Sequence, residues 1–147
     1  MATVWSQYHD TLLTLSSAQG LVVDLRQAVT IELAAAFRAI VVGISFGIVT
    51  ACDPMGIYQN PAVNRVRTDM LQKEIESTFL SHALVGACSV DGSHCEASFA
   101  LAADLASITA LATRYDQLGI FWFDGNSFWI IPARSTNAPL RLPIPPD

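Results

Sequence analysis

Polar side chains that can bind a ligand or move a proton gather where a predicted strand gives way to a predicted helix. Thr50 and Asp53 lie at the end of the strand that starts at Phe46, and Asn64 and Arg65 lie in the first turns of the next helix. A helix N-terminus offers free N–H groups and a positive dipole end, and an arginine clamps a carboxylate or phosphate with its planar fork. The pattern predicts a pocket for a small anionic or nucleotide-like ligand.

The same residues also have a purely structural interpretation. Arg65 can pair with Asp69 one turn later in the helix. Asn64 can hold the loop, and Asp53 can begin an Asp-Pro turn. The two interpretations differ in whether these side chains converge on one cleft.

A second group of candidates lies on the strand predicted after residue 94. His94, Glu96 and Ser98 alternate in the sequence, so they share one face of that strand. A Glu beside a His can do general acid–base work, which makes Glu96 and Asp53 candidate catalytic bases of a hydrolase or transferase. More often such a polar row is the solvated face of a sheet, and the opposite face, with residues such as Leu84 and Phe99, would be a core face.

The three cysteines are too few for a disulfide framework. Cys88 and Cys95 become cross-strand neighbours if Asp91-Gly92 forms a two-residue turn, a pair that favours type I′. A disulfide between them is sterically allowed. The N-terminus lacks the basic and apolar regions of a signal peptide, so we expect a reduced, cytoplasmic setting and two core thiols.

No metal site and no cofactor are predicted. His9, His82 and His94 are isolated in the sequence, and no two of them have ligand spacing. Glycine-rich phosphate loops and dinucleotide fingerprints are absent. Cys52 could act as a nucleophile, but a single Cys at the end of a buried strand is usually a small core residue.

The composition limits the classes of partner. The 147 residues carry a net charge of −5 and only one lysine, Lys73, so clustered cations for binding a nucleic-acid backbone are missing. Charged residues make up 14% of the chain, against about 25% in a typical domain. This apolar surplus suggests that a partner, for example a second copy of the chain, covers some apolar surface.

The apolar stretch at residues 29–52 raises the question of a membrane span. Glu32 and Arg38 interrupt it, and the clean part from residue 39 is too short to cross a bilayer as a helix. We therefore predict the end of a helix followed by a buried strand, and no membrane association.

Periodicity and turn signals predict an α+β domain over residues 1–131. We expect a mixed sheet of about six strands with two hairpins, and helices packed mainly on one of its faces. Five of the seven prolines lie from residue 132 onward, so residues 132–147 are predicted to form an extended tail. The expected helices cover residues 3–14, 30–41, from 61 and from 105, and the expected strands cover residues 21–25, 46–51, 84–90, 95–102, 120–123 and 128–131.

The last predicted hairpin is apolar on both faces, which leaves two alternatives. Either it is central in the sheet, or its outer face is an interface. We favour the interface, with Trp122 and Trp129 as the residues through which copies would associate. An alternative function is then a protein-interaction module that uses this hairpin and the proline-rich tail.

Four short motifs in this order resemble a bacterial family, the domain of unknown function numbered 3293. They are Thr50-Ala51-Cys52-Asp53-Pro54, then Asn64-Arg65, then the run from Asp91 to Phe99 that contains Glu96, and finally Tyr115-Asp116-Gln117 before an apolar strand. The resemblance covers roughly residues 40–131. It points to Thr50, Asn64, Arg65, Glu96 and Gln117 as site positions but implies no activity. Cys52 stands where the family has Trp, and Asp53 where it has Asn, so a shared ligand would be bound differently.

Overall fold

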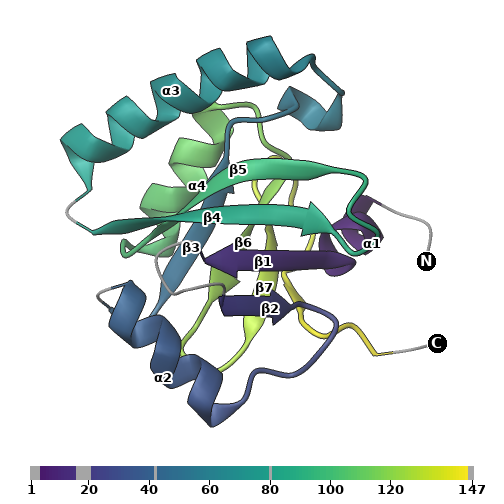
Figure 1. Cartoon of the computed structure of the whole chain (residues 1–147), viewed down its shortest axis with the longest axis vertical. Coiled ribbons are helices and arrows are strands. Elements are labelled where there is room, and N and C mark those ends of the chain that lie inside the picture. The colour runs from purple at the N-terminus through teal and green to yellow at the C-terminus, as the bar shows by residue number, and fades with distance from the viewer. Residues whose placement is uncertain (1–3, 16–20, 42, 80, 146–147) are drawn as a thin grey trace.

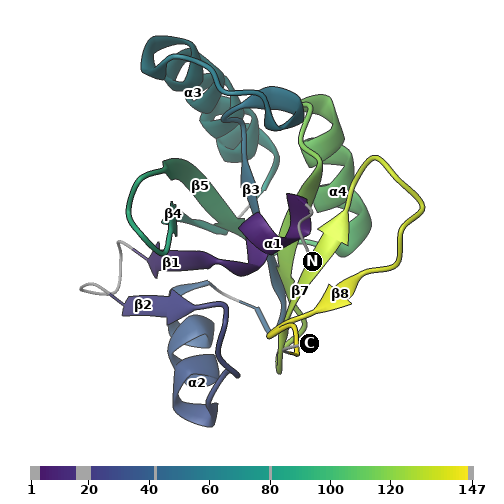
Figure 2. The same ribbon diagram turned by 90° about the vertical axis from the view of Figure 1, so that its right-hand side faces the viewer.

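Eight strands form one sheet in the computed structural model, which describes residues 4–15, 21–41, 43–79 and 81–145. The strand order is β2-β1-β4-β5-β3-β6-β7-β8, and the sheet curls into a half-barrel (Figures 1 and 2). The strands are β1 (Thr11–Leu15), β2 (Leu21–Asp24), β3 (Phe46–Thr50), β4 (His82–Ser89), β5 (Cys95–Leu101), β6 (Gly119–Phe123), β7 (Phe128–Pro132) and β8 (Leu140–Arg141). The helices are α1 (Val4–His9), α2 (Ile31–Ile40), α3 (Pro61–Thr78) and α4 (Leu105–Arg114), with a 3-10 turn, η2 (Pro54–Gly56).

The α+β class is confirmed, but the predicted sheet is wrong in two respects. It has eight strands and not about six, and every pairing between described strands is antiparallel. Helix α4 joins β5 to β6, which lie on opposite sides of β3 and are both antiparallel to it. Strands β5 and β6 therefore run parallel to each other, as in a helical crossover. They do not pair, because β3 lies between them.

The predicted helix at residues 3–14 ends early, because its second half is strand β1. In β1 the buried and half-buried side chains alternate, with Leu13 and Leu15 fully buried. Leu12 and Leu15 also fit a helical spacing that starts from Tyr8, so the sequence pattern was ambiguous over this short run. Pairing with both β2 and β4 satisfies the backbone and decides the outcome.

The sheet has an apolar core on each face, and helices pack on both, so the prediction of helices mainly on one face is wrong. Phe37 of α2 packs edge-on against three phenylalanines on the inner, concave face. Leu71 of α3 and Ile108 of α4 are fully buried on the outer face. In Figure 2, α2 lies below the sheet, and α3 and α4 lie above and beside it.

The apolar hairpin β6–β7 lies within the sheet, between β3 and β8, as in the first of the two alternatives. Phe121 and Phe123 belong to the inner core, and Ile120 and Ile131 belong to the outer core. The chain itself therefore covers both faces of this hairpin. Its two tryptophans are half-buried against the outer core, and association of copies through them stays a prediction.

The proline-rich segment adds an edge strand to the sheet. Residues 133–139 form neither helix nor strand, and β8 then pairs with β7. Leu142 is buried in the inner core. Residues beyond 131 thus contribute to the same hydrophobic core as the strands before them.

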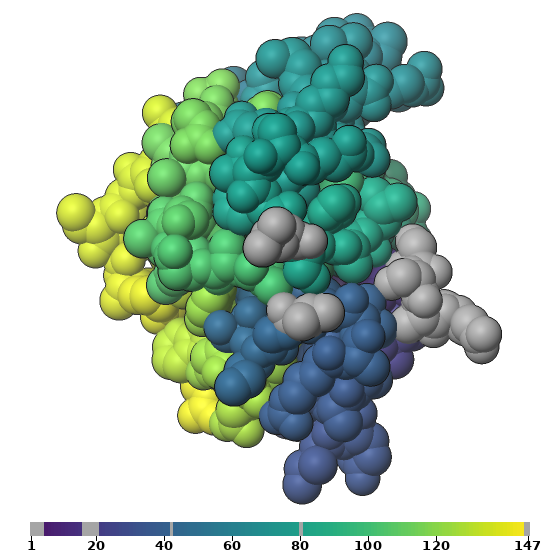
Figure 3. All heavy atoms as spheres, turned by 90° about the vertical axis from the view of Figure 1, so that its left-hand side faces the viewer, coloured from purple at the N-terminus to yellow at the C-terminus, as the bar shows by residue number. Residues whose placement is uncertain are grey.

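The apolar stretch at residues 29–52 contains α2 and β3, as predicted. Helix α2 begins at the N-cap Thr30, whose side chain accepts a hydrogen bond from the backbone N–H of Leu33. It stands out from the body of the molecule at one end (Figure 3). Across the described ranges, no helix combines the length and apolar character needed to cross a membrane.

Candidate functional site

Asp53, His94 and Glu96 converge at one end of the half-barrel, and we call these three residues the carboxylate–histidine cluster. The His94 Nε2 atom lies 3.4 Å from Asp53 Oδ2 and 3.2 Å from Glu96 Oε1. The register of the sheet brings them together. Thr50 of β3 is paired with Ser98 of β5, so the loop after β3 runs beside the residues that precede Ser98.

Asp53 is held in place by the start of α3. Its backbone N–H donates to Asn64 Oδ1, and its Oδ1 accepts from Asn64 Nδ2 and from the Gln59 N–H, each at 2.9 Å. Its φ of 48° is left-handed, a conformation that Asp tolerates better than most residues. Because Oδ1 accepts both of these hydrogen bonds, Oδ2 remains directed towards His94.

Glu96 is largely buried on the inner face of β5. Burial raises the pKa of its carboxyl above the usual value, and the negative charge of Asp53 adds to this increase. The hydrogen bond with His94 acts in the opposite direction and lowers this pKa. Burial, together with the charge of Glu96, also raises the pKa of the Tyr8 hydroxyl. The Asp53 and Glu96 carboxyls are therefore poorly solvated, whereas the His94 ring between them is half exposed.

A cavity of about 460 Å³ opens between α1 and the tip of the β4–β5 hairpin, a volume in the range of small-molecule sites. All three residues of the carboxylate–histidine cluster lie in its wall, together with Asp10. Neither Lys nor Arg is present among its described lining residues. The full lining is Ser6, Gln7, Tyr8, Asp10, Thr11, Asp53, Gly56, Ala87, Cys88, Ser89, His94, Glu96, Gln117, Leu118 and Phe121.

The other predicted site residues mainly bond to the backbone. The Thr50 hydroxyl donates to the Ala97 carbonyl and accepts from the Cys52 N–H. Gln117 lines the cavity, but its Nε2 donates to the carbonyls of Cys52 and Tyr115. These two side chains, like Asn64, fix the loop that carries Asp53.

Arg65 is exposed on α3 and does not line the cavity. The arginine that reaches the end of β3 is Arg67, which the sequence analysis missed. Its Nε donates to the Ala51 carbonyl at 2.7 Å, and its Nη2 donates to the Tyr115 carbonyl at 2.6 Å. Helical spacing was the available signal, because residues 64, 67 and 71 share one face of a helix and Leu71 is in the core.

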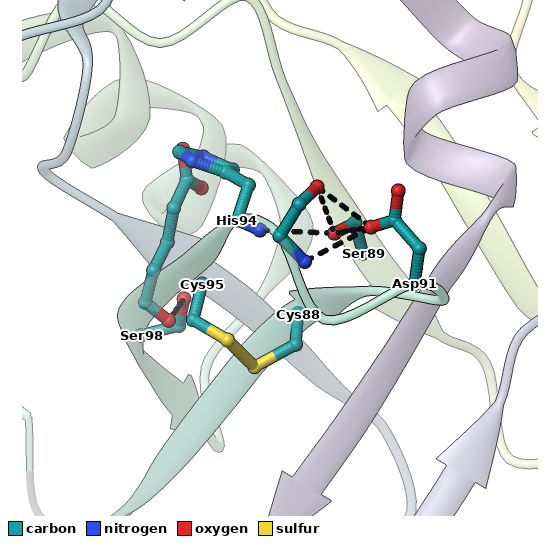
Figure 4. The surroundings of a disulfide bond; sticks show 8 residues. Cys88, Ser89, Asp91, His94, Cys95 and Ser98 are labelled. Atoms are coloured by element: carbon teal, nitrogen blue, oxygen red, sulfur yellow. Dashed lines mark hydrogen bonds and ion pairs between the residues drawn. A yellow bond between two sulfur atoms is a disulfide. The ribbon is translucent and has the colours of Figure 1, made fainter.

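Cys88 and Cys95 form a disulfide, so the prediction of two reduced core thiols is wrong. The predicted cross-strand pairing of the two residues is confirmed. Cys95 is exposed and Cys88 lines the cavity, so neither is a core residue. Figure 4 shows the disulfide joining the two strands beside the turn that carries Asp91, with the His94 side chain directed away from it.

The two faces of the β4–β5 hairpin also differ from the prediction. Leu84, expected in the core, is 51% exposed, whereas Ser98, expected on a solvated face, is 2% exposed. The curl of the sheet turns the face with Ser98 inward. The predicted type I′ turn is wrong as well, because only Gly92 has a positive φ, and Asp91 instead accepts hydrogen bonds from Ser93.

Residues 49–120 match the model of a family described as a protein of unknown function, DUF3293. The resemblance seen in the sequence is thereby confirmed over this stretch, which starts in β3 and ends in β6. It contains the whole carboxylate–histidine cluster, but not α1, which supplies Tyr8 to the cavity. No curated protein and no solved structure matches the chain.

Proposed function

We propose that this chain is a small-molecule-binding domain whose ligand occupies the cavity beside α1, with its polar end against the carboxylate–histidine cluster. The observation that carries the proposal is the convergence of Asp53, His94 and Glu96, from two separate segments, in the wall of a cavity of about 460 Å³. Such cavities combine an apolar lining with a few polar groups that orient the ligand.

The charge of the lining favours a neutral or positively charged ligand over an anion. Asp10, Asp53 and Glu96 face the cavity, and the His94 ring lies within hydrogen-bonding distance of the last two. At an effective dielectric constant of about 20, a negative charge about 4 Å from an unpaired carboxylate is repelled by about 4 kcal/mol. The anionic ligand expected from Arg65 is therefore disfavoured here, because Arg65 lies outside the cavity.

The remaining wall supplies apolar contact. Phe121, Leu118 and Ala87 face the same space, and the ring of Tyr8 packs against Phe121. The best-fitting ligand carries hydroxyl or amine donors at one end, where carboxylates accept hydrogen bonds, and an apolar body at the other.

A thermal-shift screen tests this proposal. The panel contains amines, polyols and nucleosides, with nucleotides and carboxylates as the anionic arm, in a buffer with a chelator. A ligand at about a hundred times its dissociation constant adds about 2.7 kcal/mol to the free energy of unfolding. We expect a neutral or cationic compound to stabilise the wild type but not Glu96→Gln. The control variant is Glu76→Gln, which removes an exposed carboxylate of α3 and should be stabilised like the wild type.

Two outcomes would contradict the proposal. One is stabilisation by anions alone that Arg65→Ala abolishes, which would place the ligand at the exposed start of α3. The other is the absence of any shift across the panel.

A further inference from the structure

We infer that the carboxylate–histidine cluster binds a divalent first-row metal ion such as Mn²⁺ or Zn²⁺. This inference deepens the proposed function, since it identifies a cationic occupant for the same site. Asp53 Oδ2, His94 Nε2 and Glu96 Oε1 supply one donor atom each, and these atoms all lie within 4.8 Å of one another.

The spacing of the donors fits a shared ion. With metal–ligand distances of about 2.1 Å, neighbouring ligands in tetrahedral or octahedral geometry lie about 3.0–3.4 Å apart. The distances from His94 Nε2 to the two carboxylate oxygens are 3.4 and 3.2 Å. The two carboxylate oxygens lie within 4.8 Å of each other, so both can reach an ion that His94 Nε2 also binds if their side chains rotate towards it.

The local charge is a separate argument. Asp53 is only 7% exposed, and among the described residues the ion pairs of Asp53 and Glu96 both go to His94. Two carboxylates beside one imidazole ring, with the Asp53 side chain almost fully buried, are unfavourable unless a cation offsets their charge. A divalent cation held between the two carboxylates would offset their charge.

The orientation of Asp53 matches that of a supported metal ligand. Ligating carboxylates are usually fixed by further hydrogen bonds from an outer shell of residues. Asn64 Nδ2 and the Gln59 N–H both donate to Oδ1, which leaves Oδ2 for the ion. The cavity adjoins the cluster, so positions on that side of the ion are open to water or to a donor atom of the organic ligand.

The donor set indicates which ion is preferred. One imidazole nitrogen and two carboxylate oxygens suit Mn²⁺, Fe²⁺ or Zn²⁺, whereas Mg²⁺ and Ca²⁺ favour sites made of oxygen alone. No thiolate joins the set, because Cys52 Sγ contacts Thr68 Oγ1 and the Ala97 carbonyl. We therefore expect Mg²⁺ to compete poorly.

Metal titration without any organic compound tests the inference. Chelator-treated protein is titrated with Mn²⁺ and with Zn²⁺ by calorimetry, and bound metal is counted by elemental analysis after dialysis. We expect one ion per chain, with an affinity that falls by at least about tenfold in His94→Ala and in Glu96→Gln. The matched control is Glu76→Gln, which removes an exposed carboxylate of α3 outside the cavity and should leave the affinity unchanged.

Two results would overturn the inference. One is the absence of saturable binding to the folded wild type. The other is binding that neither His94→Ala nor Glu96→Gln weakens, because the chain would then attract cations only through its general charge. His94 is half exposed, so His94→Ala should fold even if Glu96→Gln does not. The metal is tested alone and the organic panel in chelator, so failure of one proposal is distinguishable from failure of the other.

Discussion

The hairpins β4–β5 and β6–β7 lie on either side of β3 and differ in what their two faces contact. Hairpin β6–β7 is apolar at nearly every position, and both of its faces are covered by the cores of the molecule. Hairpin β4–β5 has alternating polar residues on its inner face, and its tip adjoins the cavity. The comparison shows how one sheet divides its roles. One hairpin is packed into both cores, and the other places Glu96 and the neighbouring His94 in the wall of the cavity.

The largest expected effect is on the free energy of unfolding, which should depend far more on a core residue of β6–β7 than on an exposed residue of β4–β5. Phe123→Ala removes a ring of β6 that is fully buried among Phe37, Phe46 and Phe128, and should lower the free energy of unfolding by about 3–5 kcal/mol. Leu84→Ala on β4 should cost below about 1 kcal/mol, because that side chain is half exposed. Urea unfolding of both variants measures the difference, and similar losses would contradict the division.

A second pair of variants concerns the anchoring of β3, the strand between the hairpins. Arg67→Met leaves the Ala51 and Tyr115 carbonyls without their charged donor and should cost about 2–3 kcal/mol. Arg65→Met, two residues away and exposed, should change the stability by less than about 0.5 kcal/mol. The same unfolding assay compares them. Equal effects would mean that Arg67 is not the residue that anchors this strand.

The disulfide provides a local test of the β4–β5 hairpin. Cys95→Ser should lower the stability by about 2 kcal/mol, the size typical of a cross-link that closes a short loop. A thiol reductant should destabilise the wild type by a similar amount and leave Cys95→Ser unaffected. Thiol titration in denaturant without reductant should find Cys52 as the one free cysteine, and three reactive thiols would refute the cross-link.

The smallest expected effect lies in the turn at the tip of this hairpin. Hydrogen bonds from the Ser93 hydroxyl and N–H and the Ser89 hydroxyl lower the pKa of Asp91 from 3.8 to about 2. Because the pKa of the folded state is below that of the unfolded state, ionised Asp91 stabilises the fold above about pH 4, and this contribution is lost as the pH falls towards about 2. Asp91→Asn should therefore be less stable than the wild type at neutral pH, and the gap should close as acid is added. A gap that does not depend on pH would contradict this account of the turn.

Local sequence signals are sufficient to predict the elements whose ends are marked by a helix cap or a turn. Asn60 and Pro61 predict the start of α3 and occupy its N-cap and first position. The Asp91-Gly92 pair predicts the register that places Cys88 opposite Cys95. By contrast, β1 and β8 are short and depend on pairing with strands distant in sequence, so periodicity alone could not identify them.

The candidate site could be predicted only in part for a related reason. Asp53 and Glu96 were identified from residue type, position and family resemblance, but the contact between Asp53 and His94 depends on the pairing of β3 with β5. The number of strands and their order decide that pairing, and neither follows from local patterns. Choosing Arg67 over Arg65 likewise required knowing which face of α3 is turned towards the sheet.

X-ray diffraction from a crystal of the protein grown with Zn²⁺, recorded at the zinc absorption edge, would test the central claim most directly. The account predicts one strong anomalous peak about 2.0–2.2 Å from Asp53 Oδ2, His94 Nε2 and Glu96 Oε1, with its open side towards the cavity. A map without a peak at these three atoms, in a crystal where Asp53 and Glu96 remain paired only with the His94 ring, would contradict it.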